Sequence, residues 1–369
     1  MKEFIEQHTR FIQDTFSQSL FKEQTLFFDI ETTGFSAKYN KIYFIGCAYC
    51  TDTHIIIKQF FSENTSDEKD ILYSFLTLCK NFHTLITFNG LGFDLPFIQE
   101  RCRIFQLTEN LSAMKHIDIF KEISSLKKIF KLENLKQKSI EKFLNLNRKD
   151  CFTGGELIQV YSEYLTDFSA EKLYLLQLHN KEDVLGMLDI LPILSYSEFF
   201  KGNFELNSFE INHYRDYYNF NTAKECKQEI IFLLKLPFHF PRRISYGMGD
   251  IYLSGYEDTV QLKVKIYQGE LKYFYSNYKD YYYLPQEDIA IHKSVAFYVD
   301  KEFRTKAKAS TCYSKKTGQF LPQYSEGFSP YFKLDYHDKI SYIEMTKKFT
   351  ESKAFQKDYV MHLLNVLLK

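Results

Sequence analysis

The sequence predicts an α/β fold, a mixed sheet flanked by helices, with an α+β appendage toward the C-terminal end. Two observations in the first half support this prediction. Short segments rich in β-branched and aromatic residues alternate with amphipathic segments, and three of the strand-like segments follow one another directly. The second half mixes strand-like and helical runs, which favours an α+β class there.

The length of the chain predicts two domains. Its 369 residues, 45% hydrophobic and 25% charged, are enough for one large or two ordinary globular domains. The polar run Lys201-Gly-Asn is a suitable boundary between two such domains. We therefore expect one domain over residues 1–200 and an accessory α+β domain over residues 201–369.

Composition also predicts where the protein resides. No apolar run approaches the roughly 20 residues that a membrane span needs, and the first residues carry acids and bases, unlike a signal peptide. Seven cysteines in a chain of this length are not a disulfide framework, and the Cys47–Cys50 pair lacks a second pair of metal ligands. We expect a cytoplasmic protein with no membrane partner, in which this pair serves packing.

The first elements can be assigned from periodicity. Residues 1–19 have apolar side chains near helical spacing, which predicts an amphipathic helix with a packing role. Three strand-like runs between residues 25 and 61 follow at short spacing and predict an antiparallel meander. Thr65-Ser-Asp-Glu68 has the spacing of a capping box and predicts a helix that continues to Cys79.

Strands then alternate with helices. Residues 84–88 and 115–120 read as strands, and the first of them leads through a glycine-containing turn into a helix with a proline in its first turn. Basic helices follow to about residue 148. A second capping box, Thr153-Gly-Gly-Glu156, predicts the next helix, with Glu156 as a cap, and one more helix is expected over about 169–189.

The first candidate site lies on the strand Thr25-Leu-Phe-Phe-Asp29-Ile-Glu31-Thr-Thr-Gly34. Side chains alternate along a strand, so Asp29 and Glu31 point to the same face. Two carboxylates this close repel each other unless a cation lies between them, and hard divalent cations prefer carboxylate oxygens. The pair therefore indicates a metal site if further carboxylates reach the same place.

Two later stretches supply such residues. Asp94, in Asn89-Gly-Leu-Gly-Phe-Asp94-Leu-Pro, lies at a strand-to-helix junction, where it serves either a site or an ordinary helix cap. His179 and Asp183 are four residues apart on a predicted helix and so share one of its faces. Asp118 ends a predicted strand, and we interpret it as a strand-end residue and not as a further site acid.

Together these three stretches resemble the three exonuclease motifs of the DEDD superfamily, whose members have a ribonuclease H-like fold. The motifs occur in the same order: Asp-x-Glu on the first strand, Asn-Gly-x-x-Phe-Asp-x-Pro after the fourth, and a late helix that ends in an aromatic residue followed by x-x-x-Asp. The second motif resembles that of the proofreading domain of family-B DNA polymerases. Residues 25–190 as a whole most resemble the YprB-type ribonuclease H-like proteins.

This resemblance implies a metal-dependent 3′→5′ exonuclease that hydrolyses phosphodiester bonds with two Mg²⁺ or Mn²⁺ ions. It makes His179 the residue that orients or deprotonates the attacking water. The Tyr branch of the superfamily has three residues between its Tyr and the last Asp, whereas the His branch has four after its His. This chain combines His with the Tyr spacing, so both roles of His179 stay open. The implied metal-binding acids are Asp29, Glu31, Asp94 and Asp183.

The implied substrate is the end of single-stranded DNA or RNA. Residues 121–149 hold nine Lys/Arg against three Glu in a chain of zero net charge, and this basic segment is a candidate for binding phosphates. A solvated helical face would explain the same charge density. The residues expected to contact the terminal nucleotide are Thr32, Asn89, Phe93 and Phe97.

Two other functions stay open at this point. One is a non-catalytic nucleic-acid- or protein-binding module on the same fold, and the other is a hydrolase of a small nucleotide. The complete set of four acids argues against the binding module, because a site that has lost its activity is free to lose carboxylates that are costly to crowd together. The basic segment favours a longer strand over a small nucleotide.

The second half carries no motif that predicts a function. We expect a helix near 220–235, a β-hairpin whose turn is Gln268-Gly269, a helix over about 286–308 with a basic end, and a closing core helix from Tyr359. This half is expected to guide the substrate or to bind a partner.

Overall fold

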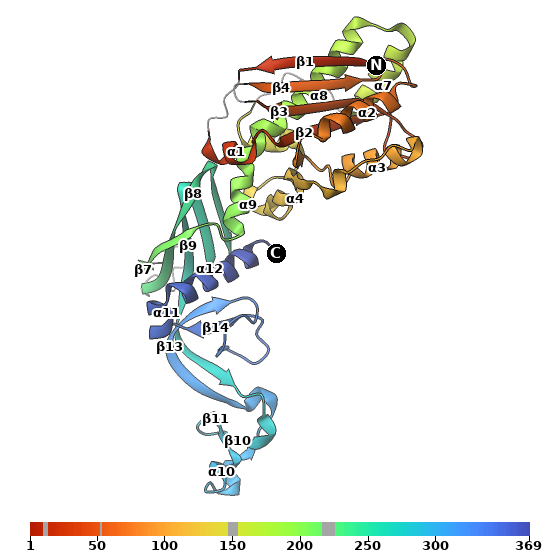
Figure 1. The fold of residues 1–369 in the computed structure, drawn as a ribbon. Helices are drawn as coiled ribbons and strands as arrows, with labels where there is room; N and C mark the ends of the chain where they lie inside the picture. The colour runs from red at the N-terminus through yellow and green to blue at the C-terminus, as the bar shows by residue number, and fades with distance from the viewer. Residues whose placement is uncertain (10–13, 52–53, 147–153, 216–225) are drawn as a thin grey trace. The chain divides into compact units, whose positions relative to one another are not determined.

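The computed structural model describes residues 1–9, 14–51, 54–146, 154–215 and 226–369. These residues form two compact units (Figure 1). The first unit consists of Met1–Glu198 together with Phe238–Arg242, and the second of Phe199–Pro237 together with Arg243–Lys369. Each unit has its own sheet and its own core, and each is described here by itself.

The first unit is built on a six-stranded mixed sheet with the strand order β1-β4-β3-β2-β5-β6. Pairing is antiparallel from β1 to β2 and parallel from β2 to β6, so the expected meander of three strands is confirmed. β2, which carries the first candidate motif, lies inside the sheet between an antiparallel and a parallel neighbour. The strands are β1 (Lys2–His8), β2 (Thr25–Thr32), β3 (Ile42–Cys50), β4 (Ile55–Phe61), β5 (Thr84–Thr87) and β6 (Lys115–Asp118).

Helices cover both faces of this sheet. On one face, α2 and α3 pack against an apolar cluster that contains Phe28, Ile45 and Phe75. On the other face, α7 and α8 pack against Phe44 and Phe61, and α8 crosses β2, β3 and β4 (Figure 1). The helices are α1 (Thr15–Leu20), α2 (Glu68–Cys79), α3 (Asp94–Phe105), α4 (Ile119–Ile123), α5 (Lys127–Phe130), α6 (Gln137–Phe143), α7 (Gly154–Asp167), α8 (Ala170–Ile190) and α9 (Leu194–Phe200).

The predicted helix over residues 1–19 is wrong. Lys2–His8 forms the edge strand β1, which pairs along its whole length with β4. The alternation of half-buried Phe4, Glu6 and His8 with exposed residues is the period of a strand, and pairing with β4 decides the conformation. A short helix, α1, begins only at Thr15, where the Asp14 carboxylate accepts a hydrogen bond from the Ser17 N–H at 2.7 Å. Residues 10–13 lie outside the described residues.

The first predicted capping box is also wrong, although its helix is confirmed. α2 begins at Glu68, whose buried carboxylate accepts hydrogen bonds from the Ile42 N–H at 2.9 Å and from the Arg101 guanidinium at 2.6 and 2.5 Å. Arg101 also donates to the Ala37 carbonyl at 3.1 Å. Glu68 therefore connects α2 with β3 and α3, so that these three elements share one buried ion pair. Thr153 of the second box lies outside the described residues, whereas the helix expected after it is present as α7.

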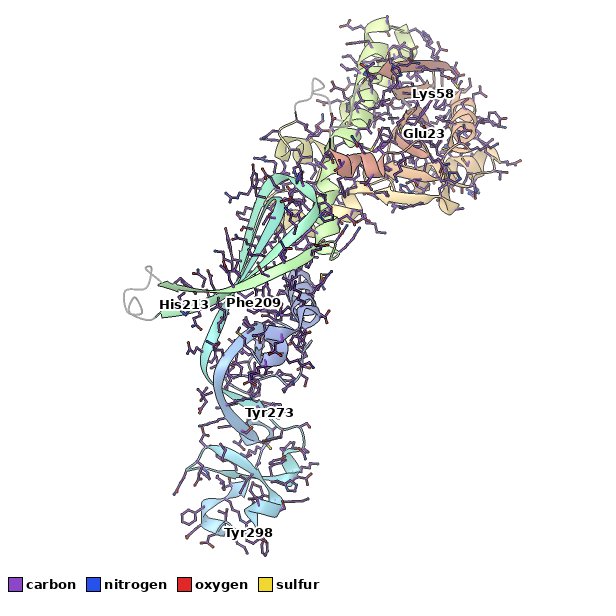
Figure 2. The ribbon with its side chains drawn as sticks, turned by 60° about the vertical axis from the view of Figure 1, so that its left-hand side comes forward. Glu23, Lys58, Phe209, His213, Tyr273 and Tyr298 are labelled. Atoms are coloured by element: carbon purple, nitrogen blue, oxygen red, sulfur yellow. The ribbon has the colours of Figure 1, made fainter. Side chains whose placement is uncertain are left out.

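The second unit confirms the α+β class of the appendage. A five-stranded sheet has the order β14-β13-β9-β8-β7, and a three-stranded sheet has the order β11-β10-β12. Phe209 of β7 contacts Phe232 of β8 and Phe349 of α11 in its core (Figure 2). The elements are β7 (Glu205–Arg215), β8 (Cys226–Met248), β9 (Ile251–Phe274), β10 (Tyr281–Leu284), β11 (Ile289–His292), α10 (Lys293–Ala296), β12 (Thr305–Lys306), β13 (Tyr313–Gln323), β14 (Ser341–Glu344), α11 (Lys347–Glu351) and α12 (Lys353–Leu367).

Three of the four elements expected in this half are wrong. The stretch 220–235 is not helical where it is described, because β8 begins at Cys226 and buried Leu234 and Leu236 alternate with exposed Lys235. The hairpin turn at 268–269 is absent, since β9 continues to Phe274 and Gly269 pairs with Gly318 of β13. Residues 286–308 contain two short strands, turns and the four-residue helix α10 instead of one long helix. The closing helix is confirmed as α12.

Two further observations concern the expected location and the cysteine pair. Among the described residues, none of the helices combines the length and the apolarity that crossing a bilayer requires. Cys47 and Cys50 lie on β3 as free thiols, the first fully buried and the second half-buried.

We predict that Arg101→Met destabilises the first unit by about 3–5 kcal/mol, because it leaves the Glu68 carboxylate buried without its partner. Denaturant unfolding followed by circular dichroism measures the loss. Arg103→Met is the matched control, since Arg103 lies on the same helix but pairs with Glu100 at the exposed surface. Equal stability of the Arg101 variant and the control would contradict the prediction. Glu68→Gln combined with Arg101→Met should recover part of the loss.

Candidate functional site

The central strand β2 positions the first two site residues. Asp29 and Glu31 lie on the face of the sheet that α8 covers, as their alternation predicts. Glu31 is 9% exposed and Asp29 is half-buried. Leu26, Phe28 and Ile30, which alternate with them, belong to the apolar cluster on the opposite face. Side-chain alternation alone therefore places the two acids on the face opposite to Leu26, Phe28 and Ile30.

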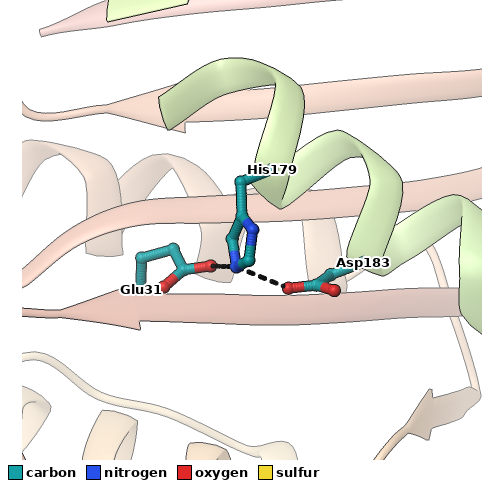
Figure 3. A group of neighbouring side chains, drawn as sticks. All are labelled: Glu31, His179 and Asp183. Carbon is teal, nitrogen blue, oxygen red and sulfur yellow. Dashed lines mark ion pairs between the residues drawn. The ribbon is translucent and has the colours of Figure 1, made fainter. Parts of the chain in front are cut away.

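Helix α8 brings His179 and Asp183 to the same place. His179 Nε2 lies 3.5 Å from Glu31 Oε1 and 3.1 Å from Asp183 Oδ2, so the imidazole bridges two carboxylates from separate elements (Figure 3). His179 is only 4% exposed, and one ligand atom from each of the three residues falls within 4.8 Å of the others. Residues 148 positions apart in the sequence are thus close enough to bind one ion together.

A glycine on β3 allows this close approach. Gly46 pairs with Asp29 across the sheet, and a Cβ at Gly46 would lie 2.2 Å from Oδ1 of Asn180. Asn180 is fully buried, and its Oδ1 accepts a hydrogen bond from Gln59 Nε2 of β4 at 2.9 Å. A side chain at position 46 would therefore displace the buried Asn180 side chain, which is next to His179 on α8. Sequence reasoning missed Gly46, Asn180 and Gln59, because no local pattern marks a glycine within a strand as a helix contact.

Asp94 reaches the site from a third element. It is buried at the first residue of α3, and its Oδ1 accepts a hydrogen bond at 3.1 Å from the Ile30 N–H, between Asp29 and Glu31. The pairing of β2 with β5 ends at Phe27, so Ile30 has no partner residue on β5. Burial, together with a smaller effect of the nearby Asp118 and Asp183 carboxylates, raises the pKa of Asp94 to about 7, and the hydrogen bond from the Ile30 N–H opposes this rise. Asp94 therefore contacts the motif strand through its side chain.

Asp118 has a structural task, in agreement with the interpretation of its sequence position. Its carboxylate accepts hydrogen bonds from the backbone N–H groups of Asn89 at 2.9 Å, Leu91 at 3.0 Å and Lys121 at 3.2 Å. It thereby caps α4 and holds the loop before Asp94, in which Asn89 has a φ of 63°. This loop is kept in place by the acid at the end of the neighbouring parallel strand.

The four residues expected to contact substrate have different surroundings. Asn89 is exposed and Phe93 is half-buried. Thr32 is 8% exposed and donates its hydroxyl to the Gly34 carbonyl at 2.8 Å, so it supports the turn after β2. Phe97 is 2% exposed and belongs to the apolar cluster under α2 and α3, so we withdraw it as a substrate contact.

Phe35 is an aromatic residue that the sequence analysis overlooked. It is 87% exposed on the turn after β2, and its ring centroid lies 6.4 Å from that of Phe93. The available signal in the sequence was its position directly after Gly34, at the end of the first motif.

The donor set of the site fits a hard divalent cation. Glu31 and Asp183 present carboxylate oxygens toward one point, and Asp94 and Asp29 bring two more carboxylates close to the same strand segment. Oxygen-rich sets of this kind suit Mg²⁺ and Mn²⁺.

A family model agrees with the architecture. The family described as the RNase_H superfamily matches residues 26–195, a little under half of the chain. A search of curated proteins found no match. Among solved structures, the family B DNA polymerase from the hyperthermophilic archaeon Pyrobaculum calidifontis is similar at 13% identity, with a TM-score of 0.39; the alignment covers 48% of this chain and 26% of the polymerase chain. The family match and the mixed sheet with its flanking helices make residues 26–195 a ribonuclease H-like domain.

Proposed function

We propose that this protein is a metal-dependent 3′→5′ exonuclease that hydrolyses phosphodiester bonds at the ends of single-stranded nucleic acid, of the DEDD type and closest to the YprB-type group. The observation that carries the proposal is the convergence of His179 with Glu31 and Asp183 within hydrogen-bonding and ion-pairing distance. Members of the ribonuclease H-like superfamily are commonly nucleases that use divalent metals, which supports a phosphodiester substrate. Without bound cations, the carboxylates of this site would repel the negatively charged phosphates of a nucleic acid.

The chain's own acids would hold the cations. Glu31 and Asp183 offer oxygens at one point, Asp29 lies on the same face of β2, and Asp94 approaches from α3. Two divalent cations, when bound, supply charge neutralisation and Lewis acidity at the phosphate. The acids would keep the cations and the phosphate in register, because Asp29 and Glu31 lie on a strand, Asp183 lies within helix α8 and Asp94 begins helix α3.

His179 is the residue that handles the proton. A neutral imidazole accepts a proton near physiological pH, and its Nε2 faces the point where the carboxylates meet. The close contact of α8 with the sheet at Gly46 holds the ring there. We propose that His179 orients the attacking water and takes its proton, in the helical position that the Tyr branch gives to its tyrosine.

The first test is degradation of 5′-labelled single-stranded DNA and RNA in Mg²⁺ or Mn²⁺. We expect a ladder that shortens from the 3′ end and is abolished by chelator. Asp29→Asn and Asp183→Asn should each lower kcat/KM by more than about 100-fold, since even residues that only orient metal ligands typically cost 10–100-fold. Asp70→Asn on the exposed surface of α2 is the matched control. Full activity of the two site variants would refute the assignment.

A second test addresses His179. His179→Ala should lower kcat by about 10²–10⁴-fold, the usual contribution of a general base, and should remove the acid limb of the pH–rate profile. Mn²⁺ affinity, measured by calorimetry, should fall much less than in Asp183→Asn. A proportional loss of metal affinity and activity in His179→Ala would make His179 a ligand and not a base.

A third test uses the raised pKa of Asp94. A carboxyl whose folded-state pKa is above its unfolded value binds more protons when folded, so stability falls as pH rises from about 4 to about 7. We expect the melting temperature of the metal-free protein to fall by a few degrees over this window, and the fall to be smaller in Asp94→Asn. Mn²⁺ should stabilise the wild type more at pH 8 than at pH 5. Identical pH profiles for the two proteins would contradict this prediction.

A further inference from the structure

A cavity beside the site has no role in the function described so far. Its volume is about 610 Å³, within the usual range of ligand pockets, and it lies between the loop after β5 and the basic segment. All of its lining residues belong to the first unit. They include Phe88, Phe120, Lys127, Asn134, Lys136 and Gln137.

One lining residue of the cavity is hydrogen-bonded to a residue of the acidic site. Gln137 Nε2 donates a hydrogen bond to the backbone carbonyl of Asp183 at 2.9 Å, so one wall of the cavity rests on α8 at a site residue. The opposite wall is Phe88 and Asn89, at the beginning of the loop that ends at Asp94. The cavity is therefore next to two segments that carry site residues, helix α8 and the loop before Asp94.

Two aromatic rings line its interior. Phe88 and Phe120 are both half-buried, and their centroids are 6.0 Å apart at an interplanar angle of 63°. The Asp118 carboxylate fixes the segments that carry both rings, because it accepts a hydrogen bond from the N–H of Asn89, next to Phe88, and caps the helix that carries Phe120. Rings held in place and partly exposed are suited to stack on nucleobases without sequence preference.

The charges of the cavity complement those of the neighbouring site. Lys127 and Lys136 are exposed at its rim, and no acidic side chain lines it. Neither lysine forms an ion pair with any residue in the described part of the chain. Lys128 and Lys138 belong to the same basic segment but do not line the cavity. A phosphate backbone would thus find cations and no carboxylate among the residues that line the cavity.

We infer that this cavity binds the nucleotides of a single strand that lie upstream of the scissile bond, with a base against Phe88 and Phe120 and phosphates at Lys127 and Lys136. The inference rests on the proposed nuclease function and deepens it. The occupant is single-stranded nucleic acid, because free bases are needed for stacking and regularly spaced phosphates for the two lysines.

The experiment measures the affinity of labelled single strands of two to eight nucleotides in chelator, so that no cleavage occurs. For the wild type, affinity should rise with length as the strand reaches the cavity. Phe120→Leu and Phe88→Leu, which keep an apolar side chain but remove the aromatic face, should reduce this rise by about tenfold, within the range of base stacking on one ring.

The lysines give a second readout. Lys127→Gln and Lys136→Gln should each lower the magnitude of the slope of log affinity against log salt by about 0.7, the value for one phosphate contact on a single strand. Lys128→Gln and Lys138→Gln carry the same charge change outside the cavity and are the matched controls. Equal slopes in the lining variants and the controls would overturn the inference, as would an affinity independent of strand length.

Failure of the nuclease proposal has a different signature. If the affinity rises with length and depends on Phe120, but no metal supports cleavage, the cavity binds strands and the catalytic assignment is wrong. If cleavage occurs but the affinity does not respond to Phe88, Phe120 or the two lysines, the site is a nuclease and the upstream strand follows another path.

Discussion

The close packing of α8 against the sheet is the constraint on which the candidate site depends. Asp29 and Glu31 are fixed by β2, but they become a constellation only when His179 and Asp183 arrive from the helix. This arrangement requires Gly46 opposite Asn180, where the helix side chain occupies the space that a Cβ would fill. Gln59 of β4 then binds Asn180 and the Gln177 carbonyl, so that polar contacts hold the helix at this depth.

Three buried acids of this domain show how surroundings decide the role of a carboxylate. Glu68 binds Arg101 and joins two helices to a strand. Asp118 accepts three backbone N–H groups and holds a loop and a helix end. Asp94 accepts the Ile30 N–H but faces other acids, and its pKa is raised. The first two are compensated by the protein itself, whereas the single hydrogen bond to Asp94 does not offset its burial, and in the function proposed above a cation would do so.

The second unit uses long paired strands in place of a compact helical core. β8 and β9 extend over 23 and 24 residues, and a small three-stranded sheet follows them in the sequence. Phe297 and Tyr298, which come directly after helix α10, are 77% and 86% exposed (Tyr298 is labelled in Figure 2). Such strands bury alternate residues only, which explains their mixed polar and apolar sequence. Guiding a substrate or binding a partner stays a proposal for this half of the chain.

Local periodicity was sufficient for the elements that carry the site. Alternation along β2 determined that Asp29 and Glu31 share a face, and helical spacing determined that His179 and Asp183 do; each pattern acts within one segment, and the structure contains both segments as expected. Only the tertiary structure decided where Asp94 points, that Phe97 is buried, that residues 2–8 form an edge strand and that β8 is not a helix. These outcomes depend on partners far away in the sequence, namely Ile30, the α2–α3 core, β4 and β7. A segment takes the conformation in which such partners satisfy its hydrogen bonds and bury its apolar surface, and local periodicity contains no information about them.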